Sequence, residues 1–237
     1  MRLDKLVSEA VGISRTDARK FIAKGQVCVN GAVCKKADTK VEQTTPLTVN
    51  GKAAEYVQYV YIMLNKPQGV VSASTDKRDV TVVNLVQKDF GRRSLFPAGR
   101  LDKDSTGFVL LTDDGGFAHD ILAPKRHVPK TYKVKLDVPV TAQMQAGFEK
   151  GVTLADGESL KPAALTPDLD DPYSCTVVLV QGVYHQIKRM FGVFDAGVVA
   201  LHRTDIGGVA LDSTLQPGAY RCLTAREVAL LKREKAE

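Results

Sequence analysis

The sequence predicts an α+β protein in which a small basic module of two helices and a hairpin precedes a larger domain with a mixed, largely antiparallel sheet. The chain of 237 residues exceeds the usual size of a single domain. From about Val60 its pattern changes to short apolar runs separated by Gly, Pro and Asp turns. Charge is uneven: the net charge is +6, and residues 1–52 hold ten Lys or Arg against five Asp or Glu, a net of +5. We therefore expect a basic module over 1–52, a linker over 53–59 and one sheet domain over 60–237.

Two helices are predicted at the start of the chain. Apolar residues recur at i, i+3, i+4 and i+7 over residues 3–10, and Gly12 can supply the left-handed residue that ends a helix. Ser14 then caps a second helix with Asp17 three residues on, a variant of the capping box, and Gly25 ends it. The exposed face of this helix is a basic ridge that begins at its N-terminus, where backbone amides favour phosphate. The ridge consists of Arg15, Arg19, Lys20 and Lys24.

Strand patterns follow these helices. Residues 27–33 predict a hairpin with Asn30-Gly31 as a type I′ turn, and the linker is expected after a second Asn-Gly turn because it lacks sustained periodicity. In the larger domain buried strands are predicted over 60–64, 108–111, 176–180 and 198–201, and a half-buried strand over 132–136. Thr224 and Glu227 form a capping box for a final helix, and the charged end 232–237 should fray.

Composition narrows the class of protein. The basic balance favours a polyanionic partner, either a nucleic acid or a lipid surface. Four scattered cysteines form no C-x-x-C pair, which argues against a zinc site or a disulfide framework and fits a reducing cytoplasm. Nowhere do eighteen apolar residues run together, so we expect a soluble cytoplasmic protein with no membrane partner.

The most unusual segment is a polar loop between two apolar runs, Gly99-Arg100-Leu101-Asp102-Lys103-Asp104-Ser105-Thr106-Gly107. Its glycines permit a close approach of a ligand to the backbone, and a carboxylate near a guanidinium can do chemistry on a substrate that bears phosphate. The alternative is a tight turn in which Asp102 and Asp104 accept hydrogen bonds from backbone amides. The residues of the loop leave both readings open.

This loop resembles the signature of the RNA pseudouridine synthases. Three further segments resemble other motifs of that family, in the family's order: Leu64-Asn65-Lys66-Pro67-Gln68-Gly69, Lys130-Thr131-Tyr132, and Gly182-Val183-Tyr184-His185-Gln186-Ile187-Lys188-Arg189-Met190-Phe191. With Leu201-His202-Arg203-Thr204-Asp205-Ile206-Gly207-Gly208 near the end, the whole chain is most similar to the RsuA branch. One departure is Phe108, where the family usually carries an aliphatic residue; it concerns packing behind the loop.

The first fifty residues resemble the S4 RNA-binding domain in their two helices, basic ridge and Val-Cys-Val-Asn-Gly hairpin. A helical cap that merely packs on the next domain would show the same pattern. The two resemblances imply an isomerase that needs no cofactor and no metal. The implied partner is ribosomal RNA, namely 16S ribosomal RNA or an assembly intermediate of the small subunit, bound by a monomer.

The resemblance also implies roles for particular residues. Asp102 is the essential carboxylate, and Lys188 is the cation that keeps it ionised in a pocket that excludes water. An apolar stripe that includes Ile187 independently predicts a helix starting near His185, which puts Lys188 in its first turn, opposed to the helix dipole and in need of a partner. An exposed lysine is the alternative. Ile187 supports the site from the same motif.

Tyr132 is expected to face inward and stack on the displaced base, although a core tyrosine would show the same alternation. Arg100 is expected to fill the gap left by a flipped nucleotide, with an ordinary phosphate contact as the alternative. Phosphate contacts are further expected at Lys66, Arg126, Arg189 and Arg203, in addition to the ridge.

Two other groups invite chemical interpretation. His185 and His119 could serve as acid or base, but a histidine at a helix start is more often a cap or a hydrogen-bonded core residue. Asp113 and Asp114, before Gly115-Gly116, could be drawn as a metal site, but without a third ligand a turn and helix start fits better.

Three rival functions remain open. A synthase acting on 23S ribosomal RNA is the nearest, and the short C-terminal end with its His-Arg-Thr-Asp-Ile-Gly-Gly segment favours the small subunit. A non-catalytic RNA-binding or ribosome-assembly protein would not need Asp102, Tyr132 and Lys188 together. A glycoside hydrolase lacks a convincing second carboxylate.

Overall fold

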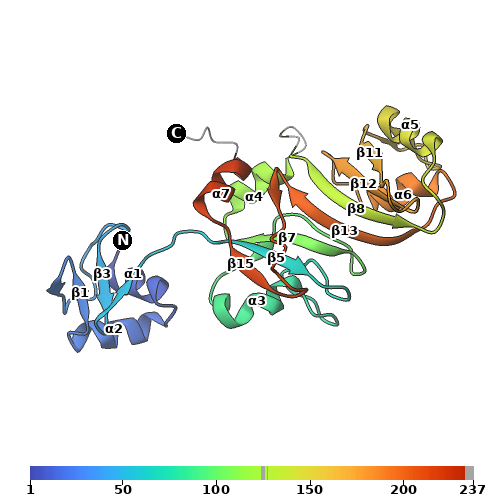
Figure 1. Cartoon of the computed structure of the whole chain (residues 1–237). Helices are drawn as coiled ribbons and strands as arrows, with labels where there is room; N and C mark the ends of the chain where they lie inside the picture. Colours follow the sequence, from blue (N-terminus) through green and yellow to red (C-terminus); the bar gives the residue numbers. More distant parts are fainter. Residues whose placement is uncertain (124–125, 127, 233–237) are drawn as a thin grey trace. The chain divides into compact units, whose positions relative to one another are not determined.

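In the computed structural model the chain forms two compact units, Met1–Tyr59 and Val60–Glu237 (Figure 1). The structure describes residues 1–123, 126 and 128–232. The end 233–237, for which fraying was expected, lies outside the described residues. None of the described helices has the length and apolarity needed to cross a membrane.

The first unit has two helices and a four-stranded antiparallel sheet. The helices are α1 (Leu3–Ala10) and α2 (Arg15–Ala23), and the sheet has the order β2-β1-β3-β4. Its strands are β1 (Val27–Val29), β2 (Ala32–Val33), β3 (Leu47–Val49) and β4 (Lys52–Ala54). The predicted helix ends are confirmed: Gly12 and Gly25 are left-handed, and the Ser14 hydroxyl accepts a hydrogen bond from the Asp17 amide.

The hairpin is confirmed, but the linker begins later than expected. Both Asn30 and Gly31 have positive φ, as a type I′ turn requires. The expectation of a linker from residue 53 is wrong at its start, because Ala53 and Ala54 pair with Thr48 and Leu47. Without an alternating apolar face, this edge strand left no periodic signal in the sequence.

The second unit contains a nine-stranded mixed sheet whose main path is β11-β12-β8-β13-β7-β5-β15. Only the β13–β7 pair is parallel among the described pairings of this sheet, so the prediction of a mixed, largely antiparallel sheet is confirmed. The strands on this path are β11 (Ala164–Pro167), β12 (Ser174–Leu179), β8 (Lys130–Leu136), β13 (Val198–Ile206), β7 (Thr106–Thr112), β5 (Tyr61–Lys66) and β15 (Tyr220–Cys222). Off the path lie β6 (Phe96–Pro97) and β14 (Val209–Ala210), while β9 (Val152–Thr153) and β10 (Ser159–Leu160) form a separate hairpin.

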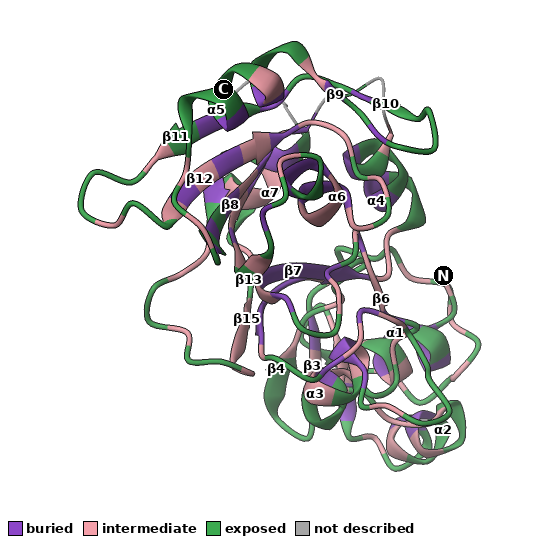
Figure 2. Cartoon of the chain, turned by 90° about the vertical axis from the view of Figure 1, so that its right-hand side faces the viewer, coloured by how far each residue is buried: buried purple, intermediate pink, exposed green. Residues whose placement is uncertain are grey.

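Helices cover both faces of this sheet, which is why its central strand β7 is buried almost throughout (Figure 2). Side chains alternate between the faces: Val109 and Leu111 join one apolar cluster, whereas Phe108 and Leu110 join the other. Helices α3 (Val82–Phe90), α5 (Ala142–Lys150) and α6 (Gln186–Gly192) contribute to the first cluster. Helices α4 (Gly115–Leu122) and α7 (Ala225–Lys232) contribute to the second, and the predicted Thr224–Glu227 capping box is confirmed.

Candidate active site

The loop 99–107 connects β6 to β7, and a buried lysine donates hydrogen bonds to its backbone. The Lys66 side chain is fully buried and donates to three carbonyl oxygens, those of Pro67, Lys103 and Ser105, at 3.1, 3.2 and 2.6 Å. Burial lowers the pKa of Lys66 to about 8, although Asp104 and Asp102 oppose the shift. The burial of Lys66 argues against the phosphate contact expected of it, because its ammonium group is enclosed by the backbone it supports.

The segment after Lys66 holds the loop as well. The Ser72 hydroxyl donates to the Leu101 carbonyl at 2.8 Å and accepts from the Leu101 amide at 3.0 Å, and the Gly69 amide donates to the Lys103 carbonyl. Leu101 and Lys103 flank Asp102, so the backbone on both sides of this carboxylate is fixed. Such fixation is what a preorganised site requires.

Arg203 reaches the loop from β13. Gly107 makes this possible: a Cβ at that position would lie 2.3 Å from the Arg203 carbonyl oxygen, so only glycine lets the two strands pair here. The Arg203 guanidinium is buried and donates to the Phe108 carbonyl at 2.7 Å, with longer contacts of 3.5 Å to the Arg100 carbonyl and the Tyr132 hydroxyl. A direct phosphate contact was also expected of Arg203, and the burial of its side chain argues against it.

Asp102 and Lys188 are brought together, as expected. Lys188 lies in the first turn of α6, and its Nζ is 3.4 Å from Asp102 Oδ2. The same ammonium group lies closer to Asp104, at 2.8 and 2.7 Å from its two oxygens. The alternative in which both carboxylates only cap backbone amides does not describe this arrangement, since each of them faces the lysine. A mainly solvent-exposed Lys188 is excluded as well, because its side chain is 25% exposed and paired.

The opposite charges of Lys188 and of the two carboxylates, Asp104 and Asp102, stabilise these three side chains close together. Burial alone would lower the pKa of Lys188, yet the hydrogen bond to Asp104 and the charges of both carboxylates raise it overall. The Lys188 hydrogen bond in turn holds the pKa of Asp104 below its usual value. Sequence reasoning assigned Asp104 no role beyond a turn; its spacing of two residues from Asp102 was the available signal.

His185 is the other residue that sequence reasoning undervalued. It was expected to be a cap or a core residue, but it makes no capping hydrogen bond, and its Nε2 lies 3.3 Å from Asp102 Oδ1. Its backbone is left-handed, with φ of 50°. Its ring stacks on Tyr184. Asp102 therefore has a different partner at each oxygen, Lys188 at one and His185 at the other.

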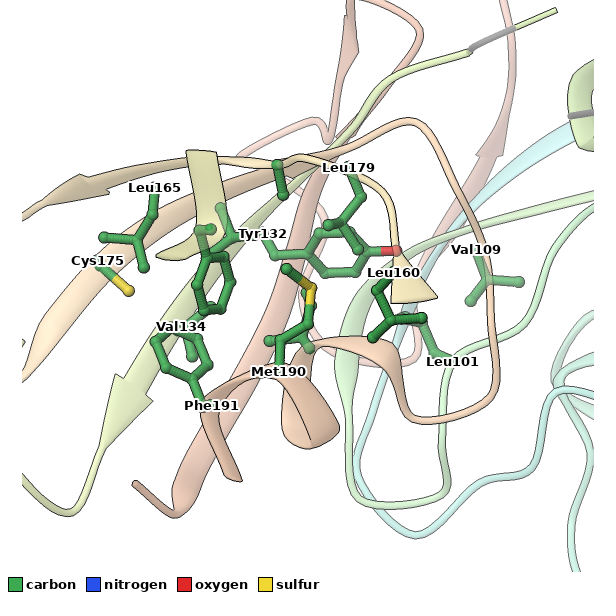
Figure 3. Packing of buried hydrophobic residues seen from close by; sticks show 14 of the residues in the cluster. Leu101, Val109, Tyr132, Val134, Leu160, Leu165, Cys175, Leu179, Met190 and Phe191 are labelled. Carbon is green, nitrogen blue, oxygen red and sulfur yellow. The ribbon is translucent and has the colours of Figure 1, made fainter. Parts of the chain in front are cut away.

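Tyr132 faces inward as predicted. It is 7% exposed and lies with Leu160, Leu179 and Met190 in the first apolar cluster (Figure 3). Ile187 is buried in the same cluster beside Lys188. Arg100 is exposed at the start of the loop, and in the described part of the chain its guanidinium makes no ion pair. The site therefore combines a carboxylate, two cationic or ionisable partners and an aromatic ring.

The residues expected to contact RNA differ in their exposure and in their acidic partners. All four ridge residues are exposed, and Arg15 and Arg19 donate to the buried Asp4 carboxylate at 3.0 and 2.9 Å. Hydrogen bonds from Arg2 and these two arginines hold the pKa of Asp4 well below its usual range. Asp4 thus binds the guanidinium groups of both arginines, while about half of each side chain stays accessible.

The remaining expected RNA contacts already have acidic partners. Arg189 bonds Asp156 and Glu158, both at 2.8 Å, and Arg126 bonds Asp120 at 3.1 Å. RNA would have to compete with these carboxylates, as it would on the ridge, where Arg15 and Arg19 bond Asp4 and Lys20 bonds Asp17 at 3.1 Å.

Asp114 caps α4 and Asp113 pairs with Arg93 at 2.7 Å, which confirms the predicted turn and helix start. His119 is exposed on α4. Within the described residues no group of three possible ligands could hold a metal ion.

Comparison with known proteins identifies this architecture. Residues 60–192 match the model of the RNA pseudouridylate synthase family, and residues 1–45 match that of the S4 domain. An uncharacterized RNA pseudouridine synthase of Bacillus subtilis, YtzG, is 41% identical over all of both chains. The ribosomal small subunit pseudouridine synthase A of Haemophilus influenzae is 40% identical over 98% of this chain and 99% of its own. A crystal structure of a pseudouridylate synthase is 39% identical, with a TM-score of 0.69 over 98% of this chain and 99% of that one.

The S4 module, the mixed sheet and the carboxylate loop define an enzyme that modifies RNA. The chain belongs to the RNA pseudouridine synthase family, and its full-length similarity places it with the synthases that carry an N-terminal S4 domain.

Proposed function

We propose that this enzyme converts a specific uridine of 16S ribosomal RNA to pseudouridine, with Asp102 as its essential carboxylate and without a cofactor. The observation that carries the proposal is the position of Asp102, in a loop fixed by Lys66 and Ser72, with Lys188 Nζ 3.4 Å from its Oδ2.

The reaction breaks the bond from N1 to the ribose C1′ and joins C5 to the same carbon. C5 loses its hydrogen and N1 gains one, so no electrons are exchanged with an external group. A carboxylate can assist by adding to the base, by capturing C1′ or by removing a sugar proton. Each route places the Asp102 carboxylate against the substrate, with Lys188 Nζ 3.4 Å from its Oδ2 as the neighbouring cation.

Tyr132 and Arg100 are proposed to handle the displaced nucleotide. A base inside structured RNA must leave its stack to reach the enzyme. The ring of Tyr132 would stack on it, and the exposed Arg100 would fill the gap in the RNA. The Arg203 contact of 3.5 Å to the Tyr132 hydroxyl supports a fixed orientation for that ring.

The choice of substrate rests on similarity and on charge. The Haemophilus influenzae relative is named for the ribosomal small subunit, and the S4 module offers an exposed basic ridge. We further propose that the enzyme acts as a monomer in the cytoplasm, on 16S ribosomal RNA or on an assembly intermediate.

The test uses transcripts of 16S and 23S ribosomal RNA labelled with tritium at C5 of uridine, because isomerisation releases that hydrogen to water. We expect release from 16S RNA by the wild-type enzyme and none by Asp102→Asn. Release from 23S RNA alone would establish the sister activity. RNA binding without release from either transcript or from small-subunit particles would establish a non-catalytic protein.

A further inference from the structure

We infer that Tyr184 and His185 form a stacking platform for the base of an unpaired nucleotide that flanks the target uridine. The inference rests on the proposed activity on RNA and adds a second base-binding position to it, outside the pocket of Tyr132.

The platform has one open face. The rings of Tyr184 and His185 are nearly parallel, with an interplanar angle of 17° and centroids 3.8 Å apart. Tyr184 is nevertheless 71% exposed. Since His185 covers one face of the tyrosine ring, the exposed area includes the other face. An aromatic face that is open to solvent is a surface on which nucleobases stack.

The platform is tied to the reacting carboxylate. His185 Nε2 lies 3.3 Å from Asp102 Oδ1, so the lower ring of the stack contacts the essential residue. A base on the outer face of Tyr184 is separated from Asp102 by two rings. It therefore cannot be the target base, and it must belong to a nucleotide close to the target in the RNA.

The backbone supports a binding role for this segment. His185 precedes α6 in a left-handed conformation that few residues other than glycine adopt, and its side chain makes no capping hydrogen bond. Residues held in such conformations cluster at ligand sites. The His185 ring contacts Asp102 and Tyr184 and does not bond the backbone amides at the start of α6.

A nucleobase fits the charges around the platform. Arg100 is exposed and lies two residues from Asp102. This cation attracts a phosphate backbone, and a tyrosine face accepts any of the four bases. If the stack of Tyr184 on His185 were only structural, it would stabilise the start of α6. Its loss would then change kcat through His185.

The first measurement compares Tyr184→Ala with Tyr184→Trp, using tritium release from labelled 16S RNA. Loss of one stacked base should raise KM about 5- to 150-fold, the range given by the 1 to 3 kcal/mol of one base–aromatic stack, with kcat nearly unchanged. Tyr184→Trp should retain the wild-type KM. Tyr173→Ala is the matched control, because Tyr173 is also exposed but lies beside Leu136 at the end of β8, and it should leave KM unchanged.

The second measurement identifies the partner by a double-mutant cycle. Binding of the wild type and of Tyr184→Ala is measured on RNA fragments with single abasic sites near the target uridine. At one flanking position the abasic site should abolish the effect of Tyr184→Ala, because the base that it would stack on is already absent. An unchanged affinity for Tyr184→Ala, a defect confined to kcat, or a defect of equal size on every abasic RNA would overturn the inference. Absence of tritium release by the wild type would instead count against the proposed function, and the binding cycle would still be interpretable.

Discussion

At the scale of single residues, the site depends on one ammonium group shared by two carboxylates. Lys188 bonds Asp104 at 2.7 and 2.8 Å and reaches Asp102 at 3.4 Å. The lysine hydrogen bond keeps the pKa of Asp104 below its usual value. Any change to this cation or to the second carboxylate should therefore alter the pH range in which the enzyme works.

Lys188→Met should lower activity most strongly at acidic pH. Removal of the ammonium group takes away the positive charge that both carboxylates face and that holds the pKa of Asp104 low, so the acid limb of the pH dependence of kcat should move to higher pH. The shift should be modest because the side chains of Asp102 and Lys188 are 28% and 25% exposed. Low activity with an unmoved acid limb would mean that Lys188 only positions the RNA.

Asp104→Asn provides the opposite change at the same place. It removes a competing carboxylate from Lys188 and leaves the cation to Asp102, so the acid limb should move to lower pH. The same pH–rate measurement decides this. An acid limb that stays in place or moves to higher pH would contradict this account.

At the scale of elements, one substitution in β5 tests whether Lys66 supports the backbone of the loop or contacts the RNA. Lys66→Met removes the donor to two loop carbonyls, those of Lys103 and Ser105, so kcat should fall because Asp102 is no longer held in place. The slope of log affinity against log salt should stay that of the wild type, since a phosphate contact would contribute about 0.7 to 0.9 to it. Lys24→Met on the exposed ridge is the control and should reduce that slope. A reduced slope in Lys66→Met would restore the phosphate role that its burial argues against.

The elements themselves were largely predictable because their signals are local. Helix caps at Ser14 and Thr224 and the alternation in β8 depend on neighbours in sequence, and these predictions are confirmed. The edge strand β4 was missed because its pairing with β3 is its main determinant. Strand existence was thus easier to predict than strand limits.

The site was predictable where motif and periodicity agreed, as for Asp102, Lys188 and the inward-facing Tyr132. Burial of long cationic side chains was not predictable. Lys66 and Arg203 read as phosphate binders because lysine and arginine are usually exposed. Lys66 bonds the carbonyls of Lys103 and Ser105, and Arg203 bonds that of Phe108, all more than thirty residues away in sequence, which no local pattern reports. The proximity of His185 to Asp102 is likewise a product of the tertiary fold.

At the scale of the whole molecule, the division into two units predicts that RNA affinity depends mainly on the first unit and the rate of the reaction mainly on the second. Deletion of residues 1–59 removes the ridge, whereas Asp102, Tyr132 and Lys188 all belong to the second unit. If the four ridge residues neutralise three or four phosphates, the salt slope of RNA affinity should flatten by roughly two to three. The single-turnover rate at saturating RNA should fall much less.

Circular dichroism of the truncated enzyme must first show that the second unit folds alone. An unchanged salt slope in a folded truncation would mean that the S4 module is not the main RNA anchor.

The central claim is that Asp102 in this chain makes one pseudouridine in 16S ribosomal RNA. Its most direct test maps pseudouridine across all ribosomal RNA from cells that lack the gene and carry either the wild-type gene or Asp102→Asn. Asparagine preserves the size of the side chain and removes only its charge, so the variant should bind RNA within a few fold of the wild type. The account predicts one 16S pseudouridine that disappears on deletion, returns with the wild type and does not return with Asp102→Asn. A complete set of 16S pseudouridines in the deletion strain, or its restoration by Asp102→Asn, would contradict it.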